Sequence, residues 1–208
     1  MALLRTIFYF LLATVFAGVV VLGLWLDVHV LQDKLREVSV TEILQEIILS
    51  TIVFLHFRLV KVSERMRECN LLIGAFFLAM LIRELDALFD IIAHGSWVWF
   101  ALMVSIAAIA FAASRYRKTV SQLSVYPQTP YYGMMISGLL CVLVFSRLFG
   151  MHALWDSVLG DQYMRIVKNM VEEGAESFGY TLCLTSSIGY YFYQCRTASQ
   201  SANASAML

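Results

Sequence analysis

Long apolar runs separated by short polar stretches dominate the pattern of this 208-residue chain. A helix needs about 20 mostly apolar residues to cross a bilayer. Six segments meet this requirement, some of them with polar residues inside. They cover roughly residues 5–26, 41–60, 70–92, 97–114, 131–150 and 169–194. The pattern predicts an all-α polytopic integral membrane protein, with about six transmembrane helices in one bundle that forms a single domain over residues 1–194.

The composition agrees with this class of protein. The chain is 60% hydrophobic and 14% charged, whereas soluble domains are about half apolar and about a quarter charged. Its net charge of zero gives no indication of a nucleic-acid partner. Its four cysteines show no metal-ligand spacing, so we expect reduced thiols that behave as small hydrophobic groups. The expected partner is the lipid bilayer, and the expected location is the bacterial inner (plasma) membrane; the oligomeric state stays open.

The distribution of lysine and arginine predicts the orientation, because cytoplasmic loops are enriched in both. With the N-terminus inside, the inner segments hold twice as many of these residues as the outer ones. The inner set is Arg5, Lys61, Arg65, Arg67, Arg115, Arg117, Lys118 and Arg196; the outer set is Lys34, Arg36, Arg165 and Lys168. Six spans return the C-terminus to the inside. Residues 27–40 are predicted as a polar connection, and residues 195–208 as a disordered cytoplasmic tail.

Ionisable side chains interrupt the third predicted span and its outer end. Because a helix advances about 100° per residue, Arg83, Asp86, Asp90 and His94 fall on one narrow face of a continuous helix. Glu84 lies about 120° from that face, and the sequence names no partner for it. The pattern therefore predicts a polar stripe that runs outward along this span.

Other acidic groups lie near the predicted outer ends of the second and sixth spans. They are Glu42 and Glu46 in the second span and Glu172, Glu173 and Glu176 in the sixth; Arg147 lies near the outer end of the fifth. An unpaired charge inside a bilayer costs about 2.5–3.5 kcal/mol or more, so such groups turn toward a bundle interior or a wet cavity. We therefore expect an acidic cavity between the second, third and sixth spans that opens to the outside.

Carboxylates with a single histidine indicate a divalent cation, with Mg²⁺, Mn²⁺ or Ca²⁺ favoured over Zn²⁺. The predicted catalytic residues are Asp86, Asp90, His94 and Arg83, and the predicted metal ligands are Asp86, Asp90, His94, Glu172, Glu176 and Glu46. Secondary candidates are Glu42, Glu84, Glu173 and Arg147. A bound ion would activate a water molecule, and Arg83 would hold an anionic group of the substrate.

Three functions remain open from these residues. The leading hypothesis is a metal-assisted hydrolase or transferase that acts on a lipid or lipid-linked substrate. The second is a cation or proton transporter, because membrane carboxylates commonly relay ions. The third is a non-catalytic structural or accessory membrane protein, in which the acids pair with nearby basic residues. His56, near the inner end of the second span, is expected to extend toward the interface as a snorkelling side chain.

Overall fold

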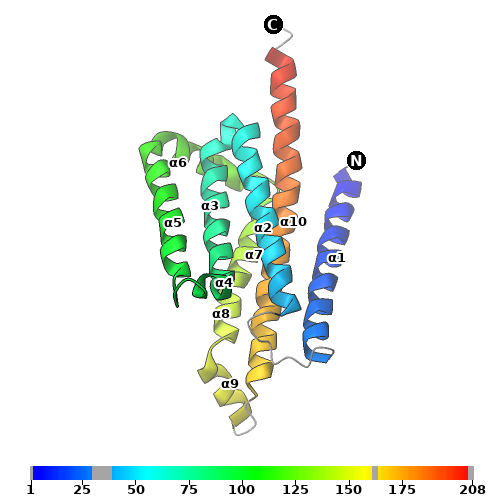
Figure 1. Cartoon of the computed structure of the whole chain (residues 1–208). Coiled ribbons are helices and arrows are strands. Elements are labelled where there is room, and N and C mark those ends of the chain that lie inside the picture. The colour runs from blue at the N-terminus through cyan, green and yellow to red at the C-terminus, as the bar shows by residue number, and fades with distance from the viewer. Residues whose placement is uncertain (1, 30–38, 161–163, 206–208) are drawn as a thin grey trace. The chain divides into compact units, whose positions relative to one another are not determined.

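A computed structural model describes residues 2–29, 39–160 and 164–205 (Figure 1). In these ranges the chain is all-helical and has no β-strand, which confirms the all-α part of the prediction. The elements are α1 (Ala2–His29), α2 (Val40–Val62), the 3₁₀ turn η1 (Glu64–Met66), α3 (Arg67–Glu84), α4 (Asp86–Asp90), α5 (Trp97–Ser114), α6 (Tyr116–Val125), η2 (Tyr126–Gln128), α7 (Tyr132–Leu140), the π-helical turn η3 (Cys141–Phe145), α8 (Ser146–Phe149), α9 (His152–Leu159) and α10 (Arg165–Ser205).

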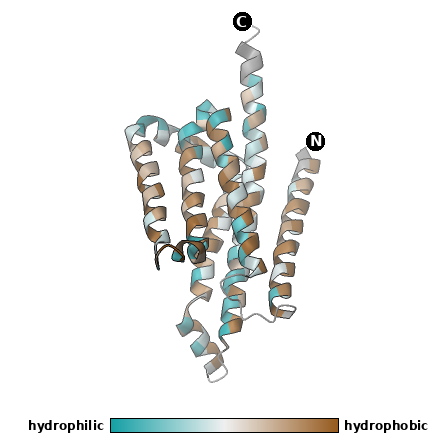
Figure 2. Ribbon diagram, viewed as in Figure 1, coloured by the Kyte–Doolittle hydropathy of each residue, from teal (hydrophilic) through white to brown (hydrophobic). Residues whose placement is uncertain are grey.

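Four helical stretches of the described chain are long and apolar enough to cross a membrane. They are Thr6–Val28, Val40–Val62, Trp97–Ser114 and Tyr132–Phe149. Figure 2 shows that α1 and α5 are hydrophobic along nearly their whole length. The chain thus has the helices of a membrane protein. The total of six spans and the N-in/C-in orientation stay predictions. The other two predicted spans correspond to α3 and the first half of α10, which carry several charges.

The last helix is longer than the sequence pattern indicates. Residues 195–205 were predicted as part of a disordered tail, but α10 continues through them to Ser205. Side-chain hydroxyls support this extension, since Thr197 donates to the carbonyl of Tyr193 and Ser199 to that of Cys195. Residues 206–208 and most of the predicted connection 27–40, with Lys34 and Arg36, lie outside the described residues.

The helices divide into two compact units, and α2, α7 and α10 contribute residues to both. The first unit comprises Met1–Ile48 and Met134–Thr185. In it, α7 and α10 pack backbone to backbone, because a Cβ on Gly138 would lie 2.7 Å from the carbonyl oxygen of Gly179. Glycine is therefore required on both sides of this contact.

The second unit comprises Leu49–Gly133 and Ser186–Leu208. Its α3 and α5 pack side by side and are joined at one end by α4 and a turn (Figure 1). At the other end α6 packs against α3, where the Gln122 side chain bonds to the buried carboxylate of Glu68.

Candidate functional site

The polar stripe predicted for the third span does not form. The helix α3 ends at Glu84, because Leu85 leaves helical geometry with ψ of 23°, and α4 begins at Asp86. Arg83, Asp86 and Asp90 consequently do not share one helical face. The predicted arrangement was wrong because it assumed a helix that continues through residue 92.

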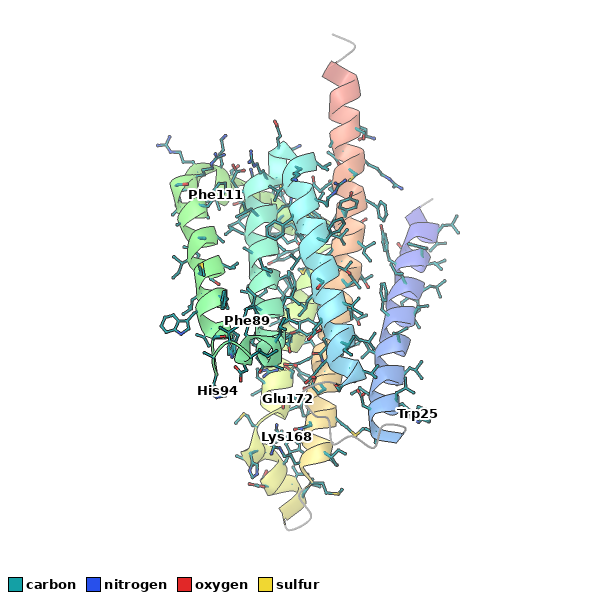
Figure 3. The ribbon with its side chains drawn as sticks, viewed as in Figure 1. Trp25, Phe89, His94, Phe111, Lys168 and Glu172 are labelled. Carbon is teal, nitrogen blue, oxygen red and sulfur yellow. The ribbon has the colours of Figure 1, made fainter. Side chains whose placement is uncertain are left out.

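Asp90 and His94 build the turn that leads into α5. Asp90 accepts hydrogen bonds from the backbone N–H of Gly95 at 2.7 Å and from His94 Nδ1 at 2.8 Å. Gly95 has φ of +74°, a conformation that favours glycine. The hydrogen bond from Gly95, followed by that from His94, lowers the pKa of Asp90. The His94 side chain is 99% exposed, and Figure 3 shows it projecting from this turn.

Glu84 finds its partner beside it in the chain. Its carboxylate lies 3.0 Å from the Arg83 guanidinium. Asp86 is exposed and bonds to the N–H of Ala87 at the start of α4. Local contacts therefore account for these three charges of the second unit.

The first unit gathers charges that the sequence had placed on different spans. The guanidinium of Arg147 forms ion pairs with Glu172, at 3.3 Å, and with Glu176. Lys168 approaches the other oxygen of Glu172 at 2.9 Å. Glu176 is only 2% exposed, whereas the Arg147 side chain is 42% exposed. We call these four residues the Arg147 cluster; Figure 3 labels Lys168 and Glu172, which lie together on α10.

A π-helical turn precedes Arg147 in the chain. The turn η3 winds more loosely than an α-helix, and π-turns occur often at functional sites. Cys141 donates to the carbonyl of Ala175, and Ser146 donates to that of Val142. These bonds fix the segment against α10 and close the turn. Arg147 follows directly and meets the glutamates of α10.

Gly150 allows the carboxylate of Glu172 to approach the end of α8. A Cβ at position 150 would lie 2.5 Å from the Glu172 Oε1 atom. Any larger residue would push this carboxylate out of its place. A glycine after an apolar helix is an ordinary helix end, so the sequence pattern does not indicate this requirement.

The acids of α2 have two different environments. Glu42 forms a reciprocal capping box with Ser39, in which each side chain bonds to the other residue's backbone N–H. Glu46 is half-buried on the same helix. The fully buried Gln45 donates to Glu173 at 2.9 Å and to Ser177 at 2.8 Å. Glu42 thus serves the helix end, and Gln45 connects α2 with α10.

Asp27 is a buried polar residue that the sequence analysis placed only in a connection. It is fully buried and accepts hydrogen bonds from the N–H groups of Val40 and Thr41 and from the Thr41 hydroxyl. The carboxylate therefore caps the N-terminus of α2 from a different helix. An acid at the end of an apolar run was the available signal, but its partner lies thirteen residues further along the chain.

An apolar groove of about 510 Å³ lies at the elbow between α8 and α9. Trp155 holds the elbow by donating to the carbonyl of Phe149 at 2.5 Å. The lining residues are Phe145, Leu148, Phe149, Met151, Ala153 and Leu154. In the sequence, Arg147 lies between Phe145 and Leu148. One short segment therefore contains both a cationic side chain and residues that line the apolar groove.

His56 in the second unit is fully buried, so the predicted snorkelling position was wrong. Its Nδ1 atom lies 3.1 Å from Asn70 Oδ1 and its Nε2 atom 3.2 Å from the Ser187 hydroxyl. Asn70 Nδ2 donates to the carbonyl of Met66. The amide oxygen therefore faces histidine Nδ1, which must carry the proton, and Nε2 accepts from Ser187. This network joins α2, α3 and α10 within the unit.

Within the described residues, no three or more His, Cys, Asp or Glu side chains are placed to hold a metal ion. The predicted six-residue ligand set thus has no support from the geometry.

No family model, curated protein or solved structure matches the chain. The Arg147 cluster and its surroundings are therefore the site from which a function can be inferred.

Proposed function

We propose that this integral membrane protein binds a lipid or lipid-linked substrate through the anionic headgroup and catalyses hydrolysis or group transfer on it. One observation carries the proposal: α8 contains both Arg147, a half-exposed side chain whose guanidinium pairs with Glu172 and Glu176, and the residues Leu148 and Phe149, which line an apolar groove. Such a combination of polar anchor and apolar wall is typical of sites for amphiphilic ligands.

The residues of the Arg147 cluster have different proposed roles, which follow from the chemistry of their side chains. A guanidinium pairs with phosphate or carboxylate through two parallel hydrogen bonds, so Arg147 is the proposed headgroup anchor, with Lys168 as a second cation. Glu172 or Glu176 is the proposed general base once the headgroup has drawn Arg147 away from them. The groove receives the apolar chain.

A divalent cation remains part of the proposal only as a companion of the substrate. Mg²⁺ is often held by one or two carboxylates together with substrate phosphates. Glu172 and Glu176 are the residues that would supply those carboxylates, and the ion would neutralise charge on the headgroup. Asp86, Asp90 and His94 have no part in this arrangement.

Binding of a short-chain lipid tests the anchor directly. Purified protein in detergent would be titrated with dihexanoylphosphatidic acid and with dihexanoylphosphatidylcholine. We expect preferential binding of phosphatidic acid, and a loss of about tenfold or more in Arg147→Ala, since hydrogen bonds to charged groups contribute about 1.5–3 kcal/mol. Arg165→Ala, which removes an exposed arginine at the start of α10, is the matched control. Unchanged binding in Arg147→Ala would overturn the proposal.

Turnover is a separate measurement. Release of inorganic phosphate or of free fatty acid from the same lipid would be followed with and without added Mg²⁺. The proposed chemistry requires that Glu172→Gln or Glu176→Gln abolish release while the lipid still binds. Binding without any turnover in the wild-type protein would leave a lipid-binding protein and would contradict the catalytic part.

Proton or cation transport is the second candidate, and a specific contact favours it. Gln45, Glu173 and Ser177 form a buried hydrogen-bonded group, and buried Thr181 and Thr185 follow along α10. A carboxylate next to a line of buried hydroxyls has the composition of an ion relay. Flux of protons or sodium into liposomes that contain the protein, lost in Glu173→Gln, would favour transport over lipid chemistry.

The number of spans, their orientation and the membrane that contains the protein are also part of this proposal. We infer six spans, with α3 and α10 as the third and sixth, both termini inside, and the bacterial inner (plasma) membrane as the location. The excess of basic residues in the segments assigned to the inside supports this orientation.

A further inference from the structure

The helix α6 of the second unit is held firmly on its buried face. Gln122 donates to Glu68 Oε2 at 2.6 Å and accepts from the backbone N–H of Cys69 at 3.0 Å. Thr119, one turn earlier, is also buried. These contacts fix the orientation of α6 relative to α3. They therefore also determine which faces of α6 point away from α3.

One of these faces is apolar and exposed. Tyr116, Val120 and Leu123 are 66%, 43% and 42% exposed. Their spacing of four and three residues places them on one stripe of a helix. An exposed apolar stripe on a short, otherwise polar helix is unfavourable in water and favourable at the boundary between lipid headgroups and acyl chains.

Cations flank this stripe at the start of α6. Arg117 and Lys118 are exposed, and neither has an acidic partner in the part of the chain that the structure describes. Arg115 is different, because it pairs with Glu68 at 3.3 Å and lies over the Phe111 ring. That ion pair also places the start of α3 beside this corner. Further exposed cations of the same end are Lys61, Arg65 and Arg67.

The position of α6 directly after α5 indicates which region of the bilayer surrounds the start of α6. The stretch Trp97–Ser114 is apolar and long enough to cross a membrane, and α6 starts two residues after it ends. Residues 116–118 therefore lie where a spanning helix leaves the hydrocarbon core. A hollow of about 620 Å³, lined by residues 113–118, opens at this corner.

We propose that the corner between α5 and α6 binds the headgroup of an anionic phospholipid of the surrounding bilayer. Arg117 and Lys118 pair with the headgroup phosphate, and Tyr116, Val120 and Leu123 contact the upper part of the acyl chains. Juxtamembrane basic residues attract anionic lipids in this way. This site is independent of the lipid chemistry proposed for the Arg147 cluster.

Native mass spectrometry of retained lipids tests the site. Delipidated protein would be exposed to an equimolar mixture of dioleoylphosphatidylglycerol and dioleoylphosphatidylcholine in detergent. We expect the wild type to retain phosphatidylglycerol preferentially, and the double variant Arg117→Glu, Lys118→Glu to lose this preference by about tenfold or more. The milder double variant Arg117→Gln, Lys118→Gln should show an intermediate preference and avoids new repulsion.

Three controls separate this site from other effects. Arg165→Glu reverses an exposed charge elsewhere and should leave the preference unchanged. Arg147→Ala, introduced into every protein that is compared, removes the other proposed anionic-lipid site, so the preference that remains is that of the corner between α5 and α6. The double variant Val120→Ser, Leu123→Ser should reduce total retained lipid while the preference for phosphatidylglycerol persists. If both double variants, Arg117→Glu, Lys118→Glu and Arg117→Gln, Lys118→Gln, retained phosphatidylglycerol with the same preference as the wild type, the proposal would be overturned.

Discussion

Single residues show that acidic groups in the described part of the chain have specific partners. Glu42 pairs with Ser39 at a helix end, Glu84 with Arg83, and Asp90 with the turn before α5. Such roles depend on whether a neighbouring N–H or guanidinium is within reach. The residue types indicated that polar partners had to exist, but the identity of each partner depends on where helices end.

Removal of the Asp27 carboxylate should destabilise the first unit. Asp27→Ala leaves buried donors of Val40 and Thr41 without an acceptor, which costs about 1–3 kcal/mol for an unsatisfied buried group. The midpoint of thermal unfolding in detergent should therefore fall. Asp156→Ala, which removes an exposed carboxylate paired with His152, should have little effect because exposed pairs contribute about 0–1 kcal/mol. Equal effects of the two substitutions would refute the capping role.

Glu68 makes the stability of the second unit depend on pH. Burial alone would raise the pKa of this carboxyl group, but hydrogen bonds from Gln122, from its own backbone N–H and from Arg115 outweigh burial and lower it. A carboxylate with a depressed folded pKa contributes stability above its ordinary pKa of about 4.5. That contribution disappears as the pH falls through the folded pKa.

Gln122→Leu tests this linkage. The variant should be less stable than the wild type near pH 7, and the difference should shrink as the pH falls from the ordinary carboxyl pKa of about 4.5 through the lower folded pKa of Glu68. The loss of the bond to Cys69 remains at every pH and gives a constant offset. Thermal midpoints measured across this range, with exposed Gln128→Leu as the control, provide the check. A difference that stays constant with pH would mean that Glu68 is not involved.

At the level of elements, the contact between α7 and α10 is the most restrictive. Gly138→Ala would place a Cβ 2.7 Å from backbone oxygen and from Cys183 Sγ, and overpacking of this kind costs about 1–3 kcal/mol. The displaced α7 should also move the turn before Arg147. Lower thermal stability together with weaker binding of dihexanoylphosphatidic acid is the expected result.

Gly133→Ala is the matched control on the same helix. A Cβ at this position meets nothing within 4 Å, and alanine favours a helix over glycine by up to about 1 kcal/mol. Stability should therefore stay equal or rise. If both glycine variants behaved alike, close packing between α7 and α10 would not be the cause.

Hydropathy predicted element boundaries closely where the backbone stays helical to the end of the apolar run. The predicted segment 97–114 coincides with α5, and 131–150 matches Tyr132–Phe149 within a residue at each end. The predicted segment 70–92 failed because Leu85 ends α3 before the apolar residues end. A π-turn such as η3 has no signature in hydropathy, so the direction of Arg147 was not accessible from the pattern.

For the whole molecule, the number of spans decides which loops share a side of the membrane. If only the four most apolar stretches cross, and the N-terminus is inside, residues 115–131 lie outside and residues 150–164 lie inside. If α3 and α10 cross as well, both loops change sides while the two termini stay inside. Fusions at the termini consequently cannot distinguish these topologies, but labels in the two loops can.

Ser121 and Ser157 are suitable positions, because both are exposed and lie in opposite loops. Single cysteines would be introduced there in a variant with Cys141 and Cys195 replaced, since Cys69 and Cys183 are buried. The six-span topology requires that a membrane-impermeant maleimide label Ser157→Cys in intact spheroplasts and Ser121→Cys only after permeabilisation. The reverse result would establish four spans. It would also move Arg117 and Lys118 to the outer leaflet, so their proposed lipid would have to be an anionic phospholipid of that leaflet.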